Sequence, residues 1–500
     1  MSIKVFSILA LFATFGSVFG QTQIGLRADN FAGIHAAALN PASTAFSPIS
    51  WDVSLVGGTF FAENNYIFVE NATVGKVIGA PQIISRPDQE GNVAPTGALF
   101  SDFRASFKSK YGAVHTSVLG PSVMIHLPQG IAFGVTTAMR FSATTRNFPA
   151  SYSHYEHTII PYDSVFTVTK MQFALAAWSE IGLNGSYKFE IGDGFASVGA
   201  NVKWLGGYQG GFLNFNLDSK FMKREPDTLR IYRPSEANVG ITDDIVTNQG
   251  VSTARNGSGV GLDMGFVLSS EEDEGDYLWK VGVSLLDIGR IRYKNNAIQH
   301  HYALTDRDSI TLYEGNYNQY TGIDAYSSIV KQSSYDVFGD SLQSLVDDKF
   351  SIALPMRLAL QGEYRVMKNV YIHGVWTQRL SQLFTPNTVG LLTAENMVAI
   401  TPRYERRWLM ISMPMELYNY SRPRIGLAAR IGPLTIGSDK LGSWLVPNAL
   451  TGTDFYAAVR IYPFWPKRER ADNNGQRGGG GGNGKAYRLP RGRMRKCYEF

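Results

Sequence analysis

The sequence predicts an all-β protein: a transmembrane antiparallel β-barrel of about 14 strands, with an N-terminal plug segment and a disordered basic C-terminal tail. Three observations predict this fold class. The chain begins with an export signal, its strand-like runs are long and alternate between apolar and charged residues, and its connections alternate between short and long. Together they indicate the outer membrane of a double-membrane bacterium.

The first element is a signal peptide over residues 1–20. Lys4 precedes an apolar run from Val5 to Phe19, and small residues at Val18 and Gly20 suit cleavage near Gly20. Cys497 is the only cysteine, so the exported chain has no internal disulfide framework.

The composition excludes a helical membrane protein. Charged residues make up only 18% of the chain, aromatic residues make up 12%, and there are 51 glycines. After the signal, no apolar run reaches the roughly 18 residues that a membrane helix needs. A soluble secreted β-protein and a membrane β-barrel both remain, because alternating strands hide their apolarity from averaged scales.

The strands alternate with period two. In Pro355–Val366, Leu358, Leu360 and Tyr364 share one face, and Arg357 and Arg365 share the other. We assign the apolar face to lipid and the charged face to the lumen. The basic residues predicted to face the lumen are Lys203, Lys280, Arg290, Arg292, Arg357, Arg365, Arg379, Arg424, Arg430 and Arg460. Glu363 is the clearest acid among them, so the lumen either favours anions or holds paired charges that stiffen the wall.

Strand length and turn asymmetry favour the barrel. Many runs have about 10 to 17 residues, whereas soluble strands usually have about 5 or 6 and a tilted membrane strand needs about 9 to 11. Short connections at 127–130, 191–194, 367–369, 405–407 and 432–433 alternate with long polar stretches. Bacterial barrels have short periplasmic turns and long outer loops.

The predicted strands form an even set whose two ends lie on the periplasmic side. Their approximate cores are 51–61, 112–126, 130–143, 171–189, 194–210, 258–270, 277–294, 354–366, 369–384, 393–404, 407–418, 423–431, 434–446 and 453–463. The barrel therefore covers residues 51–465. Tyr66 to Val74 is either a continuation of the first strand or a separate strand.

Residues 21–50 form the predicted plug. They are small and mixed, and Asn40-Pro41 favours a turn. The stretch LNPASTAF, residues 39–46, resembles the NPA-containing hatch that precedes the barrel in FadL-type fatty-acid transporters and in the related PorV-type barrels of type IX secretion. The segments at 283–293, 354–366 and 424–441 resemble an uncharacterised group of such exported barrels. The resemblance implies the fold and a hatch that includes Leu39, Asn40, Pro41 and Ala42, but no cargo.

Residues 466–500 form a Gly-rich basic tail with ten Lys and Arg against three Asp and Glu. The segment GGGGG at 478–482 predicts a flexible linker, and the tail is too polar to bury a core. We expect it to emerge in the periplasm and to dock a partner. The residues assigned to docking are Tyr487, Leu489, Arg493, Arg495, Cys497, Tyr498 and Phe500.

The sequence gives no support for an enzyme, a cofactor or a metal site. His154 with His157, and His300 with His301, lack a third ligand at a fixed spacing. The expected partners are outer-membrane lipid and a periplasmic or secreted protein, with no nucleic acid.

Three functions remain open at this point. The first is a FadL-like conduit for small hydrophobic or amphiphilic molecules. The second is a PorV-like barrel that transports nothing and docks envelope or secreted proteins. The third is a soluble secreted β-protein.

Overall fold

The computed structural model describes most of residues 23–463. The described ranges are 23–85, 96–104, 109–148, 162–225, 228–242, 246–247, 250–251, 253–270, 272–273, 276–305, 307–317, 319, 326–394 and 396–463. The predicted signal peptide, the tail docking residues from Tyr487 to Phe500, and His154 and His157 lie outside the described residues.

The wall is a closed antiparallel barrel of 14 strands. In order, its strands are β1 (Trp51–Asn64), β5 (Lys110–Leu119) with β6 (Ser122–His126), β7 (Ile131–Phe148), β9 (Gln172–Ile191), β10 (Gly194–Phe215), β16 (Gly257–Ser270), β19 (Trp279–Tyr293), β23 (Phe350–Ala353) with β24 (Arg357–Met367), β25 (Val370–Arg379), β27 (Met397–Glu405), β28 (Leu409–Ser412) with β29 (Met415–Tyr418), β30 (Arg422–Ile425) with β31 (Leu427–Ile431), β32 (Leu434–Ser438) and β34 (Gly452–Ile461). β34 pairs with β1 from Ile461 opposite Val53 to Gly452 opposite Glu63, which closes the sheet. The predicted fold class is confirmed.

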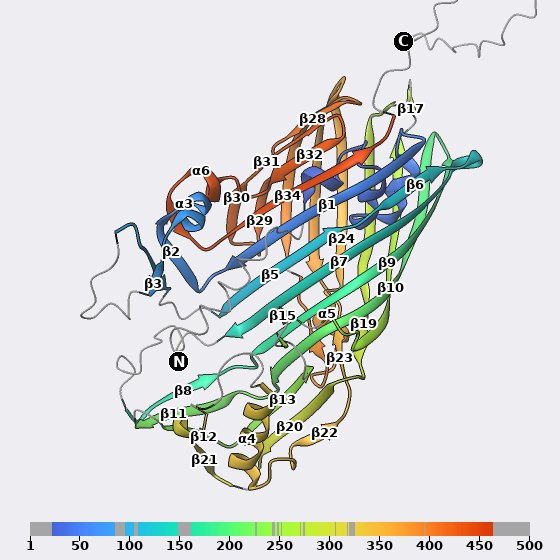
Figure 1. Ribbon diagram of the computed structural model, residues 1–500. Helices are drawn as coiled ribbons and strands as arrows, with labels where there is room; N and C mark the ends of the chain where they lie inside the picture. Colours follow the sequence, from blue (N-terminus) through green and yellow to red (C-terminus); the bar gives the residue numbers. More distant parts are fainter. Residues whose placement is uncertain are drawn as a thin grey trace, which may run out of the picture. The chain divides into compact units, whose positions relative to one another are not determined.

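The two ends of the barrel differ (Figure 1). One end has short connections, such as η4 (Pro128–Gly130) and the turn between β9 and β10, and we call it the short-turn end. At the other end β7, β9 and β10 continue to lengths of 18, 20 and 22 residues. By the rule for bacterial barrels, the short-turn end faces the periplasm and the long-loop end faces the outside.

The long strands carry an extension at the long-loop end. β13 (Ser235–Thr242), β20 (Ala297–Leu304) and β22 (Leu345–Asp347) continue the wall, and α4 (Tyr326–Phe338) packs on β20 and β21. A separate sheet has the order β21 (Ser309–Tyr313), β12 (Thr228–Tyr232), β11 (Ser219–Glu225), β8 (Ser164–Val168). Smaller elements are η6 (Glu314–Asn316), β14 (Val246–Thr247), β15 (Gly250–Val251), β17 (Glu272–Asp273) and β18 (Asp276–Tyr277).

A side sheet lies beside the seam between β1 and β34. It consists of β2 (Ile67–Ala72), β3 (Ile83–Ser85), β4 (Leu99–Phe103) and β33 (Asn448–Leu450), with the short helices α3 (Val74–Gly79) and α6 (Gly442–Leu445). The run after Tyr66 is therefore a separate strand. The predicted strands over 369–384 and 434–446 are too long, because α5 (Ser381–Phe384) and α6 replace their ends.

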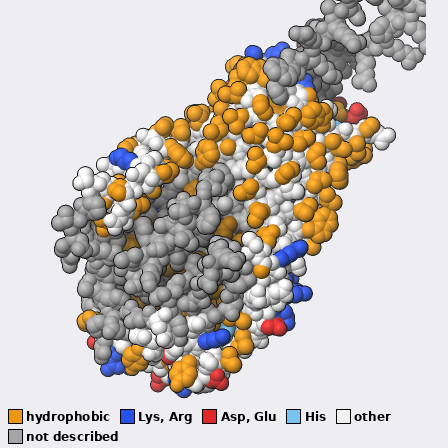
Figure 2. Space-filling model, viewed as in Figure 1, with side chains coloured by type: hydrophobic (Ala, Val, Ile, Leu, Met, Phe, Trp, Pro, Cys, Tyr) orange, Lys and Arg blue, Asp and Glu red, His pale blue; other side chains and the backbone are white. Residues whose placement is uncertain are grey.

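The outer wall is apolar. Leu427, Val281 and Leu360 are 44%, 45% and 42% exposed, although each is a large hydrophobic residue. At the short-turn end a ring of exposed aromatic residues surrounds the barrel, formed by Trp51, Tyr187, Trp279, Tyr364 and Trp408. Figure 2 shows hydrophobic side chains over the wall around β1, β5 and β6, and charged side chains gathered at the opposite end. An apolar band with an aromatic girdle places the protein in the outer membrane. In the described ranges, no helix has the length and apolarity to cross a membrane.

Candidate functional site: the hatch and the barrel lumen

The segment before β1, residues 23–50, is called the hatch here. It folds as α2 (Ile24–Arg27), η1 (Gly33–Ala38) and η2 (Pro41–Phe46), and lies inside the barrel at the short-turn end (Figure 1). Its small residues Ala32, Ala37 and Ala42 are at most 1% exposed. Because alanine has little side chain, three short helical turns fit across the lumen.

The NPA tripeptide fixes the middle of the hatch. Asn40 caps η2, since its Oδ1 accepts a hydrogen bond from the Ala42 N–H at 3.0 Å, and Pro41 occupies the first helical position. The Asn40 Nδ2 donates to the carbonyl oxygens of Phe266 and Val283 at 3.2 and 3.3 Å. Asn40 therefore shapes the hatch and attaches it to β16 and β19.

The neighbouring hatch carbonyls accept hydrogen bonds from the wall. Leu39 O accepts from Ser284 Oγ at 2.7 Å and from Gln361 Nε2 at 3.0 Å. Ala42 O accepts from Ser197 Oγ at 2.9 Å. Pro41 O accepts from Asn184 Nδ2 at 3.3 Å. The structure thus places all four predicted hatch residues against the wall: Asn40 on backbone carbonyls of β16 and β19, and the other three on inward-facing side chains of β9, β10, β19 and β24.

Arginines hold the other side of the hatch. Arg430 Nε lies 2.5 Å from Asp29 Oδ2, and both side chains are buried. Arg403 Nη1 donates to Ala28 O at 2.7 Å, and Arg460 Nη2 donates to Phe31 O at 2.7 Å. Burial alone would raise the pKa of Asp29, but Arg430 and Arg403 outweigh it and hold the pKa below its usual value.

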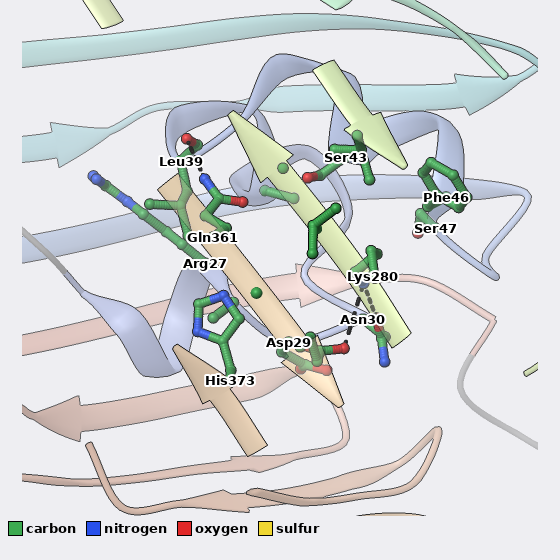
Figure 3. Close-up of a pocket in the computed structure, with 17 residues that line it drawn as sticks. Arg27, Asp29, Asn30, Leu39, Ser43, Phe46, Ser47, Lys280, Gln361 and His373 are labelled. Atoms are coloured by element: carbon green, nitrogen blue, oxygen red, sulfur yellow. Dashed lines mark hydrogen bonds and ion pairs between the residues drawn. The ribbon is translucent and has the colours of Figure 1, made fainter. Parts of the chain in front are cut away.

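A cavity of about 40 Å³ separates the hatch from β19, β24 and β25 (Figure 3). Lys280 points from the wall toward Asn30, with Nζ 2.7 Å from Asn30 Oδ1. His373 Nδ1 and Ser47 Oγ line the cavity, and both are buried without a hydrogen-bond partner among the described residues. At about 10–15 Å³ per molecule, this polar space fits a few ordered waters.

A layer of buried ion pairs lies next to the hatch. Lys203 Nζ is 2.7 Å from Asp263 and 2.8 Å from Asp287. Arg357 reaches Asp287 at 3.6 Å. Arg140 Nη2 is 2.8 Å from Glu180 Oε1. A second cavity, of about 50 Å³, lies between this layer and η1.

These pairs decide between the two sequence-based interpretations of the basic lumen. Each of Lys203, Lys280, Arg357, Arg424, Arg430 and Arg460 lies within 4.0 Å of a carboxylate. Of the two interpretations, the one with paired charges holds for these residues, and the anion-favouring interior does not. Sequence reasoning missed the acids Asp29, Asp52, Glu63, Asp263 and Asp287, although alternation puts Asp263 on the same face of its strand as other buried residues.

The predicted lumen position is wrong for Arg290 and Arg292. Both are exposed, whereas Ile291 and Tyr293 between and beside them are fully buried. A bulge causes this change of phase: Leu286 and Asp287 of β19 together lie opposite Asp263 of β16. Arg365 and Arg379 are half-buried at the ends of β24 and β25.

Toward the long-loop end the lumen becomes apolar. A cluster of buried residues fills it, including Trp178, Leu205, Phe212, Ile291, Tyr293, Phe350, Ile352 and Leu392. An inner strap, residues 386–394, crosses this region. Its β26 (Gly390–Leu391) pairs in parallel with β23, and Thr393 N donates to Thr144 Oγ1 of β7 at 3.2 Å. Asn214 Nδ2 of β10 donates to Asn387 O and Val389 O.

The two adjacent histidines of β20 do not form a joint metal site. His300 Nδ1 bonds to Ser344 Oγ at 2.7 Å, and His301 Nδ1 bonds to Asn238 Oδ1 at 3.0 Å. Burial, with a smaller contribution from Lys331, lowers the pKa of His300 to about 4. The neutral imidazole therefore acts as a structural hydrogen-bonding group.

A closed 14-strand barrel with an apolar outer band and a folded internal hatch defines a plugged outer-membrane β-barrel. Residues 41–439 match the model of the family described as "Family of unknown function (DUF5723)". The chain belongs to this family. No curated protein matches the sequence.

Several solved structures of FadL-type channels are similar to the chain. A mutant of the TodX monoaromatic hydrocarbon channel is 10% identical with a TM-score of 0.40, covering 86% of this chain and 94% of that one. The toluene transporter TodX of Pseudomonas putida is 8% identical with a TM-score of 0.28, covering 90% and 100%. A FadL homologue of Pseudomonas aeruginosa is 10% identical with a TM-score of 0.24, covering 90% and 100%.

Proposed function

We propose that the protein is a gated conduit that moves small hydrophobic or amphiphilic molecules across the outer membrane. The observation that carries the proposal is the apolar layer inside the lumen. Ile291, Ile352, Phe350 and Leu205 face inward and are at most 3% exposed. A pore for polar solutes has a polar, water-filled interior, so an apolar interior favours apolar cargo.

The hatch is the second part of the proposed conduit. Its attachment to the wall combines hydrogen bonds and ion pairs at single atoms, such as those of Leu39 O, Ala42 O and Asp29, with small apolar clusters around Ile24, Leu26 and Ile34. The polar contacts can exchange for contacts with water, and the apolar clusters are small and separate instead of forming one continuous interface. The hatch therefore acts as one closure on the short-turn side of the apolar layer, and the inner strap, whose Leu392 belongs to that layer, acts as a second closure in series.

Entry of N-phenylnaphthylamine, a probe that fluoresces in apolar surroundings, tests the proposal in intact cells. Cells that carry the wild-type protein should take up the probe faster than cells without it. Ile291→Asn should slow uptake, while Val260→Asn, on the outer face of the adjacent strand, should not. Heat-dependent gel mobility confirms that both variants form barrels. Equal uptake with and without the protein would refute the conduit.

Planar bilayers test the closures directly. Deletion of residues 30–48 should leave a barrel that inserts but conducts ions more freely. Deletion of residues 386–394 alone should raise conductance less than deletion of both segments together. Unchanged conductance after the hatch deletion would show that the hatch is not the closure.

Docking of an envelope or secreted protein is a second candidate function. The sheet β21-β12-β11-β8 gives it support, because it lies beyond the wall and exposes Val165 and Tyr313 by 55% and 54%, and Tyr162, just before β8, is 53% exposed. Removal of residues 162–168 should abolish a partner cross-link without changing barrel assembly. An unchanged set of cross-links would end this alternative. A role for the tail residues around Cys497 stays a prediction.

A further inference from the structure

An apolar ledge projects from the outer face of the barrel, formed by α3 and α6. Ile78 on α3 is 75% exposed, and Leu445 and Val446 at the end of α6 are 66% and 57% exposed. α3 and α6 are in contact with each other (Figure 1). Ile78 and Leu445 are among the most exposed large hydrophobic residues of the part of the chain that the structure describes.

Trp444 attaches the ledge to the lipid-facing wall. Its indole ring packs on Phe455 of β34, with ring centroids 6.0 Å apart, and its Nε1 donates to Asp454 O at 3.1 Å. Asp454 and Tyr456 are buried inside the barrel, so Phe455 between them points outward. α6 therefore lies on the outside of the barrel, against the same face that carries the apolar band.

The height of the ledge matches the edge of the bilayer. Phe455 pairs with Phe60 of β1, and Trp51 at the start of β1 belongs to the aromatic girdle at the short-turn end. At about 3.4 Å per residue and a tilt of roughly 40°, the distance from Trp51 to Phe60 is about 23 Å along the barrel axis. The apolar band of such barrels is about 25 Å tall, so Trp444 lies at its extracellular edge.

The polar groups of α6 face the barrel, whereas Lys76 of α3 is exposed with its Nζ 3.1 Å from Asn71 O. Lys440, before α6, is half-buried with its Nζ 2.7 Å from Glu63 Oε2, and Ser443 Oγ donates to Lys440 O. The arrangement of α6 is thus opposite to that of a helix on a water-soluble protein, whose apolar face is buried. It is the arrangement of an element surrounded by lipid.

We propose that the α3–α6 ledge is inserted in the outer leaflet of the outer membrane, where Ile78, Leu445 and Val446 contact acyl chains. Lipid is favoured over a protein partner because α6 packs through Trp444 on Phe455, on the lipid-facing surface of β34. The ledge then fixes the depth and the tilt of the barrel on the side where its strands are shortest. This proposal does not depend on the cargo or on transport.

Depth-dependent fluorescence quenching tests it in full-length protein reconstituted into phosphatidylcholine and phosphatidylglycerol vesicles. Cys497 is the only native cysteine, so Cys497→Ser removes the background. Single cysteines then come from Ile78→Cys, Leu445→Cys and Val446→Cys, each labelled with bimane. Leu427→Cys on the barrel wall is the lipid control. Asp308→Cys, just before β21 of the sheet β21-β12-β11-β8, is the water control, because the native side chain is 86% exposed.

Acyl-chain nitroxide lipids should quench bimane at positions 78 and 445 as strongly as at 427, and should leave 308 unquenched. If Ile78→Cys or Leu445→Cys fails to show heat-dependent gel mobility, Val446→Cys replaces it. Quenching at the level of position 308 for all folded ledge variants would overturn the proposal. So would loss of quenching with rising protein density in the vesicles, since that result shows that a second copy or another protein covers the ledge.

Discussion

The two halves of the lumen are filled in different ways. In the half at the short-turn end, the hatch meets the wall through aligned polar contacts, such as Asp29 with Arg430 and Ala42 O with Ser197, interspersed with small apolar clusters. In the half at the long-loop end, apolar side chains such as Ile291 and Phe350 pack on one another. Polar contacts require specific partners and apolar contacts require only volume, so the two halves should respond differently to substitution.

The largest effect is expected at the hatch end, from Arg430→Met. The substitution leaves the buried Asp29 carboxylate without its closest cation, and breaking a buried pair in this way costs about 3–5 kcal/mol. This loss of stability should detach the hatch locally from the wall, while the strands of the barrel stay paired. Hydrogen exchange of residues 23–50 should accelerate, and single-channel conductance should rise.

The control for this prediction removes both charges. Asp29→Asn combined with Arg430→Met leaves no unpaired buried charge, so it should restore most of the slow exchange. If the single and the double variant exchange equally fast, the ion pair is not what holds the hatch.

The next effect concerns the apolar half. Ile291→Ala removes a fully buried side chain and should lower the free energy of unfolding by about 2–5 kcal/mol. Because this layer does not touch Asp29 or Arg430, hatch exchange should stay at the wild-type rate. Urea unfolding followed by gel mobility measures the loss, and Val260→Ala on the outer face serves as the matched control. Faster hatch exchange in Ile291→Ala would show that the two halves are coupled.

Sequence reasoning predicted the strands of the wall but few of the contacts inside the lumen. Alternation reports one strand at a time, so the run from Trp279 to Tyr293 was located but not the bulge at Asp287 that reverses its phase. Arg290 and Arg292 were misplaced for this reason. The partner acids were missed because ion pairs such as Lys203 with Asp263 join residues of different strands. The inner strap was missed because its residues show no hydrophobic periodicity.

A second comparison sets the two faces of one strand against each other. Leu358 faces lipid and Arg357 faces the lumen beside Asp287. Leu358→Arg should cost about 2–4 kcal/mol, because it puts a charge in the apolar band. Arg357→Leu should cost less, since Lys203 stays 2.8 Å from Asp287. The yield of heat-modifiable barrel in outer-membrane fractions ranks the two variants, and equal yields would contradict the assignment of faces.

The smallest effect tests how closely the hatch approaches the wall. Gly199 of β10 faces the hatch, and a Cβ atom added there would meet the backbone N of Ala42 at 2.6 Å. A Cβ atom added to Gly185 of β9 would meet no neighbouring atom within 4 Å. Gly199→Ala should therefore displace η2 and cost about 1–3 kcal/mol, whereas Gly185→Ala should be tolerated. Ser197 would keep its place in β10, but its hydrogen bond to Ala42 O would lengthen. Hydrogen exchange of residues 40–46 should rise in the first variant alone. Equal protection in both would mean that the hatch can shift without loss of its polar contacts, and that the tight fit beside the NPA tripeptide contributes nothing to closure.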